Sequence, residues 1–199
     1  MNSTLRLGLL VLSVIALGVM VSQDVKRSCA ASRPDGGQDV LGLGTVKVIG
    51  PVKCPPGGTT GTTCTEITVS CPDANGGPDL PNLDAILGVS YPTGPTVGTV
   101  ILLSGGKGTD FLNNGFPYDY VNNGFQVVQL AWASDWADAN HAGVKSAACR
   151  PSTVFQYVFN TVHGGSRTKA FCGQGLSGGG RRWLTRWRTT ALQTISTTL

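Results

Sequence analysis

Short apolar runs that alternate with helical segments are the feature that most limits how this chain can fold. Residues 98–104, 125–131 and 169–172 are largely apolar, which is typical of strands buried on both faces. Residues 109–122 can hold a helix interrupted at its proline, and residues 151–162 place apolar side chains along one helical face. This order of strands and helices predicts an α/β fold with a mostly parallel central sheet and flanking helices.

The stretch before this alternation has a different pattern. Residues 45–49, 64–70 and 86–91 are β-prone and are separated by turns rich in glycine and proline. We expect antiparallel or edge strands that lead into the parallel part. Charged residues make up only 13% of the 199-residue chain, which excludes a charged coiled coil.

The N-terminus has the pattern of an export signal. Arg6 is followed by an uncharged run over residues 7–21, which has the length of a signal-peptide core and is short of the ~20 apolar residues that span a bilayer. We expect a secreted, periplasmic or extracellular protein; an uncleaved N-terminal membrane anchor is the alternative. Lipidation at Cys29 is disfavoured because Lys26 and Arg27 stand just before it.

Export makes the cysteines candidates for disulfides. Cys54, Cys64 and Cys71 are ten and seven residues apart and lack the close pairs of a zinc site, so we expect no metal there. Cys54 is expected to pair with Cys64 or Cys71. Cys149 precedes the second helix and Cys172 ends the third strand at what should be the same sheet edge, which predicts a second disulfide between them.

A glycine-rich turn at residues 173–180 follows the third strand and fits two motifs. Gly173, Gly175 and Gly178 spell the dinucleotide fingerprint G-x-G-x-x-G, whereas Gly175, Ser177 and Gly179 spell the nucleophile elbow G-x-S-x-G. The first motif belongs at the first strand–helix unit and requires an acidic residue about 20 positions later, and no acidic residue follows. The elbow is favoured, with Ser177 as the nucleophile and no cofactor.

With this elbow and the Gly105-Gly106 turn after residues 98–104, residues 60–180 resemble the secreted α/β-hydrolase family. The resemblance implies a serine esterase, lipase or peptidase that works through an acyl-enzyme on Ser177. It also implies oxyanion donors at the amides of Gly178, Gly105 and Gly106. The later strands of the family's sheet have no counterpart, so the fold is expected to be partial, with an open edge that favours self-association.

The chain departs from this family after its serine. The family order is serine, then an acid, then histidine, but none of the twenty-two residues after Ser177 is Asp, Glu or His. His141 and His163 are the only histidines, and both precede the serine, so each is a weak candidate for the general base. No acid or base of a triad is therefore assigned, and the chain as written is expected to have little or no hydrolase activity.

The tail is also atypical. Four arginines lie within residues 181–188, and without residues 181–199 the chain has 11 basic and 11 acidic residues, so its net charge of +4 belongs to the tail. A nucleic-acid or membrane patch is a distant interpretation, and no nucleic-acid partner is expected. Shifting the reading frame after Gly180 permits small, helix-forming residues, so we hypothesise that a frameshift truncates the hydrolase sequence there.

These features divide the chain into four parts. The first part is an N-terminal signal or anchor at residues 1–30, and Cys/Gly/Pro-rich strands follow at residues 31–85. The third part is half of a hydrolase core at residues 86–180, and the last is the atypical tail at residues 181–199. The alternative to a hydrolase is a non-catalytic exported binding or surface protein. The substrate class is not encoded in any recognisable specificity loop.

Overall fold

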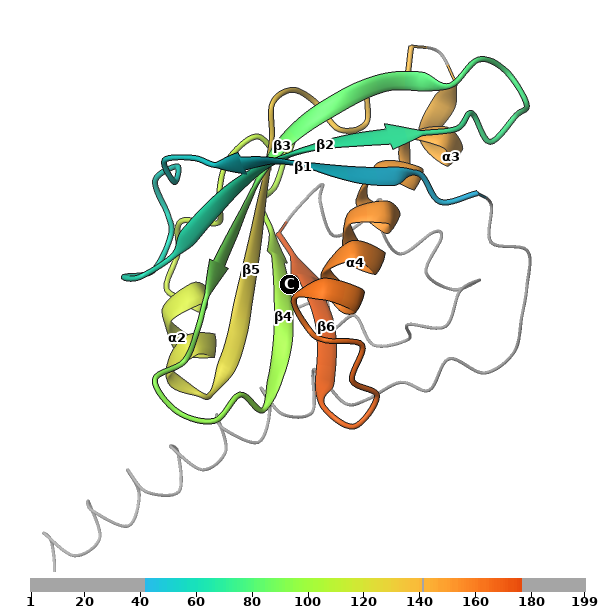
Figure 1. Ribbon diagram of the computed structural model, residues 1–199. Helices are drawn as coiled ribbons and strands as arrows, with labels where there is room; N and C mark the ends of the chain where they lie inside the picture. The colour runs from blue at the N-terminus through green and yellow to red at the C-terminus, as the bar shows by residue number, and fades with distance from the viewer. Residues whose placement is uncertain (1–41, 141, 177–199) are drawn as a thin grey trace, which may run out of the picture.

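The computed structural model describes residues 42–140 and 142–176, and these form one six-stranded sheet flanked by helices (Figure 1). The strand order across the sheet is β1-β2-β3-β5-β4-β6. The strands are β1 (Thr45–Pro51), β2 (Thr63–Cys71), β3 (Leu80–Ser90), β4 (Gly98–Leu103), β5 (Phe125–Trp132) and β6 (Ala170–Gly175). The chain is thus an α/β protein, as its alternating pattern predicts.

The sheet is mixed, so the expectation of a mostly parallel sheet is wrong for the described residues. β1, β2, β3 and β5 pair antiparallel in that order, and only β5–β4 and β4–β6 are parallel. Short connections join β1 to β2 and β2 to β3, and such connections return the chain antiparallel. Parallel pairing needs a longer crossover, and here α2 and α4 lie in the two crossovers that produce it.

The helices differ in extent from the sequence pattern. α2 (Phe116–Asn122) has proline in its first turn, so Pro117 begins the helix and does not interrupt a longer one over residues 109–122. α4 (Cys149–Thr161) contains the amphipathic run, and a five-residue helix, α3 (Gly143–Ala147), precedes it. Such a short helix leaves no periodic pattern in the sequence.

Two apolar clusters lie on opposite faces of the sheet. Val154, Phe155 and Val158 of α4 pack on one face, where Ile101 and Val128 belong to the same cluster. On the other face, Tyr120 of α2 belongs to a cluster with Val100, Leu102 and Val127. These residues of β4 and β5 alternate along their strands with those of the first cluster, as side chains of a strand do. β4 and β5 are buried along their whole length because they lie between these layers.

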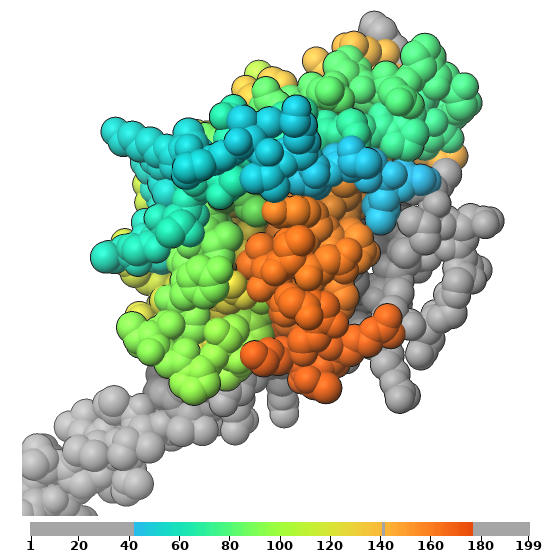
Figure 2. Space-filling model, viewed as in Figure 1, coloured from blue at the N-terminus to red at the C-terminus, as the bar shows by residue number. Residues whose placement is uncertain are grey.

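The two outer strands are less covered. β1 is mostly exposed, with Val48 and Ile49 about half accessible, and its residues lie at the surface in the space-filling view (Figure 2). β6 pairs with β4 on one side only among the described residues. β3 spans residues 85 and 86, where the sequence suggested a boundary, so both sides of that boundary contribute to one sheet.

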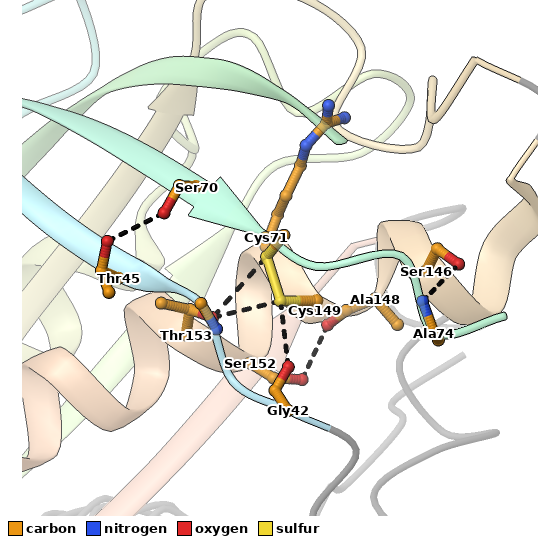
Figure 3. Close-up of a disulfide and its surroundings, with 12 residues drawn as sticks. Gly42, Thr45, Ser70, Cys71, Ala74, Ser146, Ala148, Cys149, Ser152 and Thr153 are labelled. Carbon is orange, nitrogen blue, oxygen red and sulfur yellow. Dashed lines mark hydrogen bonds between the residues drawn. A yellow bond between two sulfur atoms is a disulfide. The ribbon is translucent and has the colours of Figure 1, made fainter. Parts of the chain in front are cut away.

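Two disulfides crosslink the described chain, one of them locally and the other between distant segments. Cys54 bonds to Cys64, which is one of the two partners expected for it. Cys71 at the end of β2 bonds to Cys149 at the start of α4 (Figure 3), so the expected Cys149–Cys172 pair is wrong. Cys172 belongs to the cluster on the α2 face of β6, whereas Cys149 and Cys71 belong to the cluster on the α4 face. The alternation of side chains along β6 therefore separates Cys172 from Cys149.

Disulfides of this kind are typical of proteins that fold in an oxidising environment. Across residues 42–140 and 142–176, no helix combines the length and the apolarity that crossing a membrane requires.

Candidate functional site

The described chain ends inside the G-x-S-x-G motif, whose first two residues are Gly175 and Leu176. β6 continues to Gly175, and the amide of Leu176 extends its ladder by donating to the carbonyl of Leu103 at 3.2 Å. Ser177 and Gly178 come next and lie outside the described residues, as does His141. Because Gly175 pairs with Leu103 at the end of β4, the elbow follows the carboxyl edge of the parallel strands, where α/β proteins place their sites.

Gly173, the first glycine of the motif, has a packing role in β6. A Cβ atom at this position would lie 2.8 Å from the ring of Phe155 on α4. Only glycine therefore lets α4 pack this closely on the strand. This requirement explains the first part of the G-x-G-x-x-G pattern without a nucleotide.

The Gly105-Gly106 turn lies at the same edge, directly after β4. Gly106 has a φ of +61°, and the amide of Gly108 closes the turn on the carbonyl of Gly105 at 3.2 Å. Within the described part of the chain, the amides of Gly105 and Gly106 donate no hydrogen bond. The oxyanion role predicted for them requires amides that can donate to a ligand oxygen.

Two tryptophans hold the far end of this turn. The amide of Trp132 donates to the carbonyl of Gly108 at 2.9 Å, and the amide of Trp136 approaches the carbonyl of Lys107 at 3.5 Å. Gly108 has a φ of +75°, and a Cβ atom there would lie 3.1 Å from each indole. The turn after β4 is therefore fixed against the loop that follows β5.

Arg150 of α4 fixes that second loop. Its guanidinium is buried and donates to the carbonyls of Trp136 at 3.0 Å, Asp138 at 2.6 Å and Pro81 at 2.9 Å. Burial lowers the pKa of Arg150, and the nearby Asp138 carboxylate opposes this shift. Sequence reasoning missed this role, because an arginine beside Pro151 carries no signal that it will be buried.

Gln129 is a second residue that the sequence analysis missed. Its side chain is buried in β5, where its Oε1 accepts the amide of Leu112 and its Nε2 donates to the carbonyl of Gly57, each at 2.9 Å. It therefore joins the loop after β4 to the loop closed by the Cys54–Cys64 disulfide. A glutamine inside a largely apolar strand was the available signal, since buried amides require partners.

Tyr120 and Gln174 form a hydrogen bond just before the elbow. The Tyr120 hydroxyl on α2 donates to Oε1 of Gln174 on β6 at 2.8 Å. Burial raises the pKa of Tyr120, so its hydroxyl stays protonated and can donate at neutral pH. The last residues of β6 are thereby held to α2.

His163 lies away from this edge. Its Nδ1 is 2.9 Å from the Thr99 hydroxyl and its Nε2 is 2.8 Å from the carbonyl of Ser166. Burial lowers the pKa of His163, as does Lys169, while the bond to Ser166 opposes the shift. Thr99 pairs with Phe171, four residues before the Leu103–Gly175 pair, and this separation is about 13 Å along a strand. His163 is thus a structural residue at the opposite edge.

Two aspartates of the loop after β5 accept hydrogen bonds from backbone amides of the same loop. Asp135 accepts the amide of Ala137 at 3.0 Å, and Asp138 accepts that of Asn140 at 3.3 Å. Among the residues that the structure describes, no group of three or more His, Cys, Asp or Glu side chains could hold a metal ion.

Comparisons with known proteins give only weak likenesses. No family model matches the chain, and no curated protein matches it. Among solved structures, a glucuronoyl esterase from Teredinibacter turnerae is 13% identical with a TM-score of 0.43, over 82% of this chain and 47% of its own. Acetyl xylan esterase 1 from a Thermoanaerobacterium species is 12% identical with a TM-score of 0.44, over 80% and 51%.

Brefeldin A esterase, described as a bacterial homologue of human hormone-sensitive lipase, is 15% identical with a TM-score of 0.38, over 92% of this chain and 46% of its own. The chain thus spans about half the length of each of these esterases. At such TM-scores the likeness assigns no family to this chain.

Proposed function

We propose that this chain carries the nucleophile half of a serine hydrolase site, with Ser177 as the nucleophile and the amides of Gly178, Gly105 and Gly106 as oxyanion donors. The observation that carries the proposal is the pair of amides at Gly105 and Gly106, which donate no hydrogen bond to any described residue. They follow the end of β4, which is directly paired with the end of β6, and the elbow motif comes next in the sequence.

The reaction is acyl transfer from an ester, thioester or amide. The Ser177 oxygen attacks the carbonyl carbon while a base takes its proton, and the carbonyl π pair moves to the oxygen, where the donors stabilise the charge. When that pair returns, the bond to the leaving group breaks and the leaving group departs with the bonding electrons. The acyl group then remains on Ser177.

This site has no assigned base, and His141 lies outside the described residues. The 199 residues contain no Asp, Glu or His after Ser177, and both ring nitrogens of His163 are engaged at the opposite edge of the sheet. We therefore propose that this chain turns over esters slowly or not at all by itself. The same observation favours the second candidate, a non-catalytic exported binding or surface protein.

A chemical-rescue experiment separates the two candidates. Imidazole added to the solution supplies the missing base, and 4-nitrophenyl acetate supplies an activated acyl group. We expect imidazole-dependent acetylation of Ser177, located by peptide mass mapping. Ser177→Ala should abolish that modification, and Ser134→Ala, at an exposed serine in the loop after β5, should leave it unchanged.

Acetyl groups spread over the lysines, with none on Ser177, would favour the non-catalytic protein. Brisk hydrolysis of the ester without imidazole would instead show that the chain already holds a base.

Three further proposals concern the rest of the chain. Export through the N-terminal signal is supported by the two disulfides, and self-association through the outer edge of β6 is supported by its lack of a partner strand among the described residues. We also propose a frameshift after about Gly180. An alternative frame of the DNA that encodes an acid and then a histidine would support it, and early stop codons in both other frames would contradict it.

A further inference from the structure

The hydroxyl of Ser104 is a buried polar group without a partner among the described residues. Ser104 follows β4, and its Oγ is shielded from solvent but makes no hydrogen bond within residues 42–140 and 142–176. Other buried serine hydroxyls of the described chain are bonded: that of Ser146 donates to Asp73, and that of Ser90 lies 2.7 Å from the Thr62 hydroxyl. An unpaired buried hydroxyl costs about 1–3 kcal/mol, so its retention calls for an explanation.

The register of the sheet places Ser104 beside Leu176, the residue before Ser177. Leu103 pairs with Leu130 on one side and with Gly175 on the other, so Ser104 lies level with Leu176. The amide of Leu176 donates to Leu103, which continues the ladder to this level. Neighbouring strands are about 4.8 Å apart, and Ser104 is therefore about one strand spacing from the residue that precedes Ser177.

Ser104 is also continuous with the proposed oxyanion turn. The next two residues, Gly105 and Gly106, carry the unbonded amides. A hydroxyl and two amides thus come from three consecutive residues at the carboxyl edge, and none of them has a partner in the described chain.

We propose that the Ser104 hydroxyl is a fourth donor of the oxyanion site, beside the three amides, and binds the carbonyl oxygen of the acyl substrate as it becomes negative. This inference rests on the proposed function. The hydroxyl has already lost its water in the free protein, so donating to the oxyanion incurs no further desolvation. Its bond strengthens as charge develops, which stabilises the transition state more than the bound ester.

A serine with a merely structural role would behave differently. In that case Ser104→Ala removes an unsatisfied hydroxyl, which leaves the free energy of unfolding unchanged or raises it, and acyl transfer is not affected. The two accounts differ in the acetylation rate and agree on stability, so measuring both in the same variants separates them.

The experiment compares variants in the imidazole-supported acetylation of Ser177 by 4-nitrophenyl acetate. We expect Ser104→Ala to slow acetylation about a hundredfold, as loss of one oxyanion donor does, without a loss of stability in urea. Ser104→Thr keeps the hydroxyl and should stay within a few-fold of the wild type. Ser90→Ala is the matched control, because it removes a bonded buried hydroxyl far from the elbow and should lower stability but not the acetylation rate.

Acetylation of Ser104→Ala at the wild-type rate overturns the role of Ser104 and leaves the proposed function standing. A Ser104→Ala variant that unfolds overturns it too, because the hydroxyl would then be structural. Failure of the wild-type chain to acetylate Ser177 overturns the proposed function and this inference with it.

Discussion

Removing the Cys71–Cys149 disulfide is expected to destabilise the protein more than removing Cys54–Cys64. The first crosslink joins residues 78 positions apart and the second joins residues 10 apart. In the chain-entropy model, closing these loops in the unfolded state is worth about 4.5 and about 2.7 kcal/mol, respectively. The predicted difference between the double alanine variants is therefore about 2 kcal/mol.

Packing also makes loss of the Cys71–Cys149 disulfide the more destabilising of the two changes. Cys71 and Cys149 are both buried in the core under α4, and the Thr153 hydroxyl lies 3.8 Å from the Cys71 sulfur and 3.5 Å from the Cys149 sulfur (Figure 3). Cys54 is only half-buried. Replacing a sulfur in the buried pair leaves a cavity that the surrounding core fills only in part, which adds to the entropic loss.

Urea unfolding under non-reducing conditions measures both variants. The two loops do not overlap in the sequence, so the losses should add in the quadruple variant, to about 7 kcal/mol, and this approaches the whole stability of a typical domain. The single variants Cys71→Ala and Cys149→Ala should each lose nearly as much as their double variant, because either one opens the crosslink. A loss at Cys54–Cys64 equal to or larger than that at Cys71–Cys149 would refute the reasoning.

Two further predictions concern buried polar residues. Gln129→Met leaves the Leu112 amide and the Gly57 carbonyl without partners, so we expect a loss of about 2–5 kcal/mol in urea and faster hydrogen exchange at Leu112; unchanged exchange there would contradict the role of Gln129. Because burial lowers the pKa of His163, the unfolded chain binds a proton near pH 6.5 that the folded chain resists, and stability should fall as the pH drops below about 6.5 and level off below the folded pKa. His163→Gln should flatten this part of the profile, and a wild-type stability that rises on acidification would show the sign to be wrong.

The sequence determined the elements whose patterns are local. β4 and β5 begin at the residues expected for them, because a strand buried on both faces is largely apolar. α4 follows its apolar face for the same reason, with Pro151 in its first turn. The G-x-S-x-G motif is equally local, but Ser177 lies outside the described residues, so the turn expected there stays a prediction.

Only the tertiary structure decided which of these elements meet. The antiparallel contact of β3 with β5 and the bond of Cys149 to Cys71 depend on strand order and on the face each side chain occupies. The same holds for the site: Arg150 and Gln129 position its loops through backbone groups distant in sequence. A local pattern fixes a residue's own conformation, but it leaves open which distant surface will bury that residue, because many partners of similar polarity satisfy the same pattern.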